Sequence, residues 1–184
     1  KSYGFLKAHG YTHIPKLLAI KSDQTGFAID ALLSKDGWDW SDTWNEERLT
    51  ATLNAMDDLA KIKPNSEYAE LLQPVVSDAD NGWVALTSSP ERQSYLASKL
   101  EAISEHGIVQ HLQEHTERSL QYHVRHDSLV HDDVRADNCA WNKHTGQVKL
   151  IDWNWLELGD RRIDFAGFLV HVQQSGFDVL ATHA

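Results

Sequence analysis

The stretch Leu129–Asp164, LVHDDVRADNCAWNKHTGQVKLIDWNWLELGDRRID, carries most of the information in this chain. It contains His131, Asp133, Asn138 and Asp152, placed after or between short apolar runs. Phosphoryl transfer needs one carboxylate that can accept a hydroxyl proton, and separate oxygen ligands for the Mg²⁺ ions that bridge nucleotide phosphates. Asp133 is the candidate base, and Asn138 and Asp152 are the candidate metal ligands. The spacing therefore indicates magnesium-dependent phosphoryl transfer.

Two of these residues are expected to meet at the end of a β-hairpin. After the strand-like run 128–130, residues 139–142 and 147–151 form two apolar segments, joined by a polar loop that contains Gly146. If residue 142 faces residue 147, then 138 faces 151, one step from Asp152. A single Asp or Asn beside a strand is most often a turn former or a cap. The complete set, with His131, Asp133, Asn138 and Asp152 at these spacings around a hairpin, would seldom arise by chance.

These residues resemble the catalytic core of the aminoglycoside phosphotransferase family, within the protein-kinase-like fold. That family carries H-G-D-x-x-x-x-N, a strand ending in I-D-W, and then G-D-x-x-x-D. The chain has His131 to Asn138, Ile151-Asp152-Trp153 and Gly159 to Asp164 at these places. The resemblance implies that Asp133 orients or deprotonates an acceptor hydroxyl, while Asn138 and Asp152 hold Mg²⁺.

The resemblance assigns further roles within the same stretch. Arg135 stands where related kinases have a Lys, and would stabilise charge on the transferred phosphoryl group; a solvated loop Arg is the alternative. His131 and Asp164 are expected to be structural supports of the loop. The chain departs from the family at Asp132, which replaces Gly, and at Asp137, which replaces a small residue. Both departures add negative charge beside the proposed base.

The N-terminal part resembles the family more loosely. A helix over 2–9 ends at a Gly, and strands over 16–20 and 27–33 follow, with a turn at 25–26. In the family the second strand leads to the hinge that holds adenine, so Asp30, Ala31 and Leu32 are the candidate nucleotide-binding residues. A glycine-rich turn, a strand Lys and a helix Glu that pairs with it are not recognisable. We therefore expect the natural protein to begin upstream, and this chain to be a fragment.

The expected fold class is α+β and protein-kinase-like, with a mostly helical C-terminal lobe, a catalytic-loop β-hairpin and a truncated N-terminal lobe. Residues 1–33 would be the remnant of the nucleotide-binding lobe and hinge, and residues 34–184 the helical lobe. Helical periodicity predicts helices over 46–62, 91–105, 108–122 and 164–174, whereas 63–90 is predicted to be irregular. Trp38, Trp40 and Trp44 lie in an acidic segment that could bind a cation or simply pack.

Composition narrows the partners and the compartment. The net charge of −10 argues against nucleic acid or an anionic membrane as a partner, and suits a cationic acceptor. The single cysteine, Cys139, excludes an internal disulfide and favours a reducing compartment, here the cytoplasm. The expected cofactors are Mg²⁺ and ATP, with GTP as an alternative. Acceptors within the family include aminoglycosides, choline, homoserine, fructosamines and sugars.

Two other functions remain open from the sequence. His123, His126 and the His131-Asp132 pair suggest a metal-dependent phosphohydrolase, because imidazole and carboxylate bind transition metals. Such His-Asp pairs usually lie on helices, whereas this pair follows a strand and precedes a hairpin. A non-catalytic binding module that keeps the kinase-like fold is the other alternative.

Overall fold

The computed structural model describes residues 2–23, 25–64, 66–69, 72, 82–102, 111–179 and 181. The chain forms two compact units. Unit 1 comprises residues 1–75 and 126–184, and unit 2 comprises residues 76–125. All the candidate site residues belong to unit 1. The lobe boundary expected between residues 33 and 34 stays a prediction.

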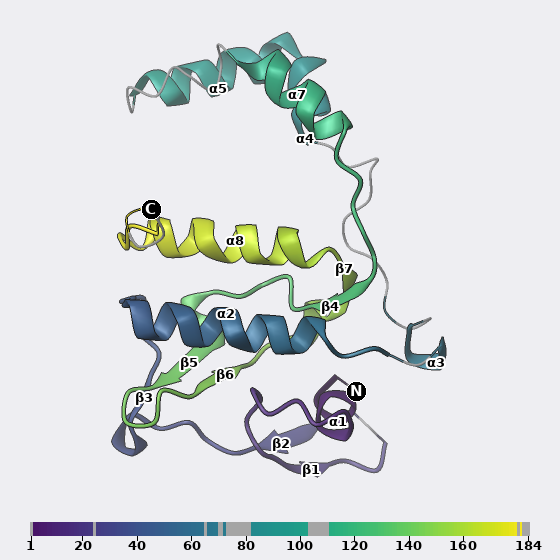
Figure 1. The fold of residues 1–184 in the computed structure, drawn as a ribbon, viewed down its shortest axis with the longest axis vertical. Coiled ribbons are helices and arrows are strands. Elements are labelled where there is room, and N and C mark those ends of the chain that lie inside the picture. Colours follow the sequence, from purple (N-terminus) through teal and green to yellow (C-terminus); the bar gives the residue numbers. More distant parts are fainter. Residues whose placement is uncertain are drawn as a thin grey trace. The chain divides into compact units, whose positions relative to one another are not determined.

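Unit 1 combines helices with short antiparallel strands (Figure 1). Its helices are α1 (Ser2–Ala8), α2 (Glu46–Ala60), α3 (Ser66–Ala69) and α8 (Arg161–Gln174). Single 3-10 turns are η1 (Ser34–Asp36), η3 (Ala136–Asn138) and η4 (Trp153–Trp155). Its strands are β1 (Leu17–Ile20), β2 (Phe27–Ile29), β3 (Trp38–Asp39), β4 (Ser128–Val130), β5 (Cys139–Asn142), β6 (Val148–Leu150) and β7 (Glu157–Gly159). The expectation of mixed helix and strand structure is confirmed.

The strands form small antiparallel sheets, in the orders β1-β2, β3-β5-β6 and β4-β7. In the β5–β6 hairpin, Cys139 lies opposite Leu150. Residue 142 donates its backbone N–H to the carbonyl oxygen of residue 147 at 2.8 Å, and Ile151 donates to that of Asn138 at 3.0 Å. The predicted facing pairs, 142 with 147 and 138 with 151, are therefore confirmed.

Helix α2 anchors the hairpin to the rest of unit 1. Asn45 caps the helix by accepting the Arg48 backbone N–H at 2.8 Å. The Arg48 side chain is fully buried in spite of its charge. Its guanidinium donates to the carbonyl oxygens of Ser41, Thr43 and Cys139 at 2.7, 3.0 and 2.9 Å. These bonds explain how the charge is accommodated, and they join the loop before α2 to strand β5.

Helix α8 packs against α2 and β4 (Figure 1). Asp160 caps its N-terminus by accepting the Arg162 backbone N–H at 3.0 Å. Phe168 and Val172 are buried on the inner face, within the helix that periodicity predicted over 164–174. The Phe168 ring meets Trp44 edge-on, with ring centroids 5.2 Å apart. The helix is therefore held firmly against the strand that leads into the candidate site.

Unit 2 contains α4 (Gly82–Thr87), α5 (Pro90–Ala102) and α7 (Leu112–Leu120). Two corrections apply to the sequence predictions. The segment 63–90, predicted to be irregular, contains α3 and α4 and the start of α5. Strand β2 ends at Ile29 rather than at residue 33: one further backbone bond runs from the Asp30 N–H to the Lys16 carbonyl oxygen, and the next element is η1, which begins at Ser34. Residues 103–110, which include the end of the helix predicted over 91–105 and the start of the helix predicted over 108–122, lie outside the described residues.

Among the helices that the structure describes, none has the length and apolar character needed to cross a membrane.

Candidate functional site

The Asp133 carboxylate is held on both of its oxygens. The Asn138 amide nitrogen donates to the Asp133 backbone oxygen and to its Oδ2, each at 2.9 Å. Arg135 Nε pairs with Asp133 Oδ1 at 3.1 Å, and the same guanidinium reaches Asp137 at 3.2 Å. The Asp133 side chain keeps 24% of its surface exposed. The candidate base is thus fixed in orientation and still open to a ligand.

The two candidate metal ligands lie at the end of the hairpin. The bond from Ile151 N–H to the Asn138 carbonyl oxygen places Asn138 beside the residue that precedes Asp152. Because the Asn138 amide nitrogen is engaged with Asp133, its Oδ1 is the atom left for a cation. Asp152 adds a carboxylate, which accepts a hydrogen bond from the Asn154 amide.

This donor set fits Mg²⁺, which takes one or two protein oxygens together with phosphates and water. A cluster of three or more His, Cys, Asp or Glu side chains placed to hold a metal ion does not occur among the residues that the structure describes. A site made from one Asp and one Asn does not require such a cluster.

Asp164, on α8, binds the backbone at the start of the loop 131–138, which connects β4 to β5. Its carboxylate oxygens accept the N–H groups of His131 at 3.2 Å and Asp132 at 3.0 Å. The side chain is buried, and this burial raises the pKa of Asp164 to about 6. These two hydrogen bonds hold the loop backbone, as a structural supporting role for Asp164 requires.

His131 is a buried and hydrogen-bonded residue. Its Nε2 lies 2.8 Å from the Ile151 carbonyl oxygen, so Nε2 carries the proton and donates. Burial lowers the pKa of His131, which keeps the ring neutral. The ring centroid lies 4.4 Å from that of Trp153. His131 therefore ties strand β4 to the end of β6.

Asp132 has a left-handed backbone, with φ of 59°. Glycine adopts such a conformation without steric cost, which accounts for the Gly that the family has between His and Asp. Burial and the neighbouring Asp133 charge raise the pKa of Asp132. The departure from Gly therefore adds both backbone strain and a second carboxylate.

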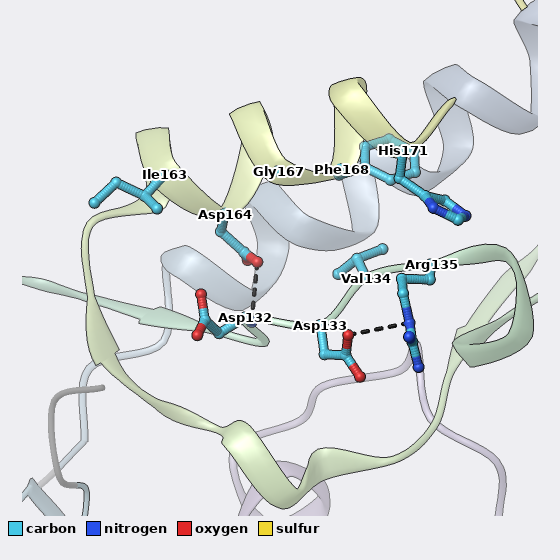
Figure 2. Close-up of a pocket in the computed structure, with 9 residues that line it drawn as sticks. All are labelled: Asp132, Asp133, Val134, Arg135, Ile163, Asp164, Gly167, Phe168 and His171. Carbon is cyan, nitrogen blue, oxygen red and sulfur yellow. Dashed lines mark hydrogen bonds and ion pairs between the residues drawn. The ribbon is translucent and has the colours of Figure 1, made fainter. Parts of the chain in front are cut away.

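A pocket of about 240 Å³ opens over the loop (Figure 2). The residues around it come from the loop and from one face of α8: Asp132, Asp133, Val134, Arg135, Ile163, Asp164, Gly167, Phe168 and His171. Carboxylates and one guanidinium therefore face a space next to the candidate base.

A comparison with solved structures shows similarity in the fold. The structure is similar to that of spectinomycin phosphotransferase APH(9)-Ia, which was solved as a complex with AMP. The TM-score is 0.56 and the sequence identity 14%, over 96% of this chain and 65% of that one. The fold is similar to that of a phosphotransferase. No protein-family model matches the sequence, and no curated protein matches it.

The three candidate nucleotide-binding residues lie directly after β2. Asp30 and Ala31 are exposed and Leu32 is partly buried. The Asp30 N–H donates to the Lys16 carbonyl oxygen at 2.8 Å, and Trp40 Nε1 donates to the Leu32 carbonyl oxygen at 3.0 Å. Trp40 is partly buried, and its ring nitrogen ties it to this segment.

Contacts that the sequence did not reveal converge on the loop and on Asp152. From α1, Ser2 Oγ donates to the Trp153 carbonyl oxygen at 3.2 Å, and the Asp152 backbone lies near enough to the Tyr3 hydroxyl to offset part of the rise that burial causes in the pKa of Tyr3. From α8, His171 binds the loop at Ala136. Ser2, Tyr3 and His171 fall in no recognised motif. The seven-residue spacing between Asp164 and His171, which places both residues on one side of α8, is a signal in the sequence that points to this contact.

Proposed function

We propose that this chain belongs to a phosphotransferase that moves the γ-phosphoryl group of ATP, or GTP, to a hydroxyl group of a small molecule. The observation that carries the proposal is the hairpin geometry. It brings Asn138 beside Asp152 and lets the Asn138 amide hold Asp133. A base and two oxygen ligands thereby converge at the open end of the β5–β6 hairpin, as phosphoryl transfer requires. Similarity to the fold of a solved phosphotransferase supports the same reaction class.

In this proposal Asp133 accepts the proton of the acceptor hydroxyl. The hydroxyl oxygen forms a bond to the γ-phosphorus, the bond from that phosphorus to the bridging oxygen breaks, and the nucleoside diphosphate leaves. The Asn138 and Arg135 contacts hold the Asp133 carboxylate in a single orientation for this step. A base fixed in this way avoids reorganisation as the proton moves.

Charge on the phosphates needs compensation close to the loop. Asn138 Oδ1 and the Asp152 carboxylate would hold Mg²⁺, which neutralises the charge of the nucleotide phosphates when it is bound. Arg135 lies beside the base and would stabilise the transferred group, while His131 and Asp164 keep the loop backbone in place. Asp30, Ala31 and Leu32 would meet the adenine. The AMP in the similarly folded enzyme supports nucleotide binding in this fold.

The test is transfer of radiolabelled γ-phosphate to a panel of amine-bearing and neutral hydroxyl compounds, using the complete protein that the gene encodes. Asp133→Asn should lower kcat by about 10²- to 10⁴-fold and leave the nucleotide Kd unchanged. Asp137→Asn is the matched control, since Asp137 pairs with the same Arg135 but is 69% exposed. Its activity should stay close to that of the wild type.

Retained turnover in the Asp133 variant would contradict the assignment of the base. A wild-type protein that binds Mg-nucleotide and transfers no phosphate to any acceptor, or to water, would favour the non-catalytic binding module.

A further inference from the structure

Helix α8 binds the loop at both ends, through two side chains on one face. Asp164 accepts the backbone N–H groups of His131 and Asp132 at the start of the loop. His171 Nε2 accepts the Ala136 N–H at 3.2 Å, near the end of the loop. Residues seven apart lie two turns apart on the same side of a helix. Figure 2 shows both side chains directed toward the loop, so α8 spans it from end to end.

The N–H that His171 holds lies between the functional side chains. Ala136 follows Arg135 directly and begins η3, which ends at Asn138. The Asn138 N–H closes this turn on the Arg135 carbonyl oxygen at 3.1 Å. A shift of Ala136 would therefore move the Arg135 guanidinium and the Asn138 amide, which hold the two oxygens of Asp133.

We propose that His171 is a positioning residue of this site, which fixes η3 so that Arg135 and Asn138 keep Asp133 in its working orientation. The effect on transfer rests on the proposed function, whereas the hydrogen bond itself does not. An N–H donor requires a lone pair on Nε2, so the His171 proton must lie on Nδ1. The ring faces a pocket that it shares with the carboxylates of Asp132, Asp133 and Asp164 and with Arg135.

The experiment compares substitutions that keep or remove an acceptor at the place of Nε2. In His171→Gln the side-chain carbonyl oxygen can take that place, whereas His171→Asn is one methylene too short and His171→Leu has no acceptor. Ser175→Ala is the matched control. Ser175 is the C-cap residue of α8, one turn after His171, and its hydroxyl donates to the His171 carbonyl oxygen at 3.0 Å.

Two readouts are measured on the complete protein. Amide hydrogen exchange at Ala136, followed by NMR, should accelerate in the Asn and Leu variants and stay slow in the Gln and Ser175→Ala variants. The kcat for phosphate transfer should fall about 10- to 100-fold in the Asn and Leu variants, as is typical when a group that orients functional ligands is lost. The KM for nucleotide should not change, and the Gln variant should recover most of the rate.

The outcomes separate the two proposals. Unchanged Ala136 exchange in the Asn and Leu variants overturns the inference, as does wild-type kcat in variants whose Ala136 exchange has accelerated. An inactive wild-type protein counts against the proposed function instead, and Ala136 exchange then still decides whether His171 holds η3. If His171→Leu does not fold, the comparison of the His171→Asn and His171→Gln variants tests the proposal in the same way.

Discussion

Asp132 occupies a position where backbone geometry and charge both favour a different residue. Its φ of 59° belongs to the left-handed region, and its carboxyl group lies beside the charged Asp133. Residues other than Gly pay a steric cost in this region of roughly 1 kcal/mol. A non-glycine residue that retains such a conformation next to a candidate base is often kept for function.

Asp132→Gly should therefore raise the free energy of unfolding by about 1 kcal/mol, measured by urea denaturation. Asp132→Ala is the control, because it removes the same carboxylate and keeps a Cβ in the left-handed conformation. We expect the Gly variant to be more stable than the Ala variant. Equal stability of the two would mean that the backbone at residue 132 is not strained.

Asp164 links protonation to stability with a defined sign. Its pKa is raised from 3.8 to about 6 in the folded protein, so between these values the folded state binds more protons than the unfolded state. The contribution to stability is complete below pH 3.8 and is lost as the pH rises through 6. A shift of this size corresponds to roughly 3 kcal/mol.

The difference in unfolding free energy between wild type and Asp164→Asn, measured from pH 4 to pH 7, should isolate this contribution, since Asn does not titrate. We expect the unfolding free energy of the wild type to fall, relative to that of Asp164→Asn, by up to roughly 3 kcal/mol as the pH rises from 4 to 7. A difference that moves in the opposite direction would show that the two backbone N–H groups outweigh burial and keep this carboxyl charged in the folded protein.

Two elements from distant parts of the sequence hold the segment that carries Asp152. The β5–β6 hairpin supplies the Asn138–Ile151 bond, and helix α1 supplies the hydroxyls of Ser2 and Tyr3. Asp152 itself is left-handed, with φ of 60° and ψ of 59°. Its backbone conformation is sterically unfavourable, and the contacts with both elements hold it in place.

Tyr3→Phe should loosen this segment by removing the hydroxyl that the Asp152 backbone contacts. We expect a loss of about 1 kcal/mol in unfolding free energy, and an increase of about tenfold in the Mg²⁺ concentration needed for half-maximal activity. Tyr11→Phe is a matched control, since the Tyr11 hydroxyl donates instead to the Ala55 carbonyl oxygen at 3.0 Å. A similar Mg²⁺ shift in both variants would argue against a specific contribution of α1.

Local patterns in the sequence were sufficient for elements whose contacts are short in range. The hairpin register followed from one Gly-containing loop, and α2 and α8 followed from helical periodicity. Pairings between distant segments were not accessible in this way, as in β3 with β5 and β4 with β7. The buried position of Arg48 depends on carbonyl groups from two other segments. No periodicity in α2 alone could have indicated it.

The same limit applies to the site. Motif spacing selected Asp133, Asn138 and Asp164 as candidates, and their contacts run within one loop and to helix α8. His171 and Tyr3 act on backbone groups, which leave no trace in the spacing of side chains. The roles of the candidate residues stay predictions until the variants are measured.

At the scale of the molecule, the two units differ in how much side-chain surface they bury. Within the described residues of unit 2, Leu112 and Thr116 are the buried ones, at 7% and 8% exposure. Unit 1 has fully buried side chains on several elements, among them Leu49, Leu129 and Leu150. The free energy of local unfolding increases with the buried apolar contacts, so unit 2 should unfold locally at a lower free energy than unit 1.

Native-state amide hydrogen exchange should therefore show α5 and α7 exchanging through openings of low free energy, while α2 and α8 exchange only near global unfolding. Limited proteolysis under native conditions should cut first within residues 76–125, and a fragment pair cut there should retain the protected amides of α2 and α8. Equal protection of α7 and α8 would mean that unit 2 unfolds together with unit 1, and that burial in its described residues does not set its stability.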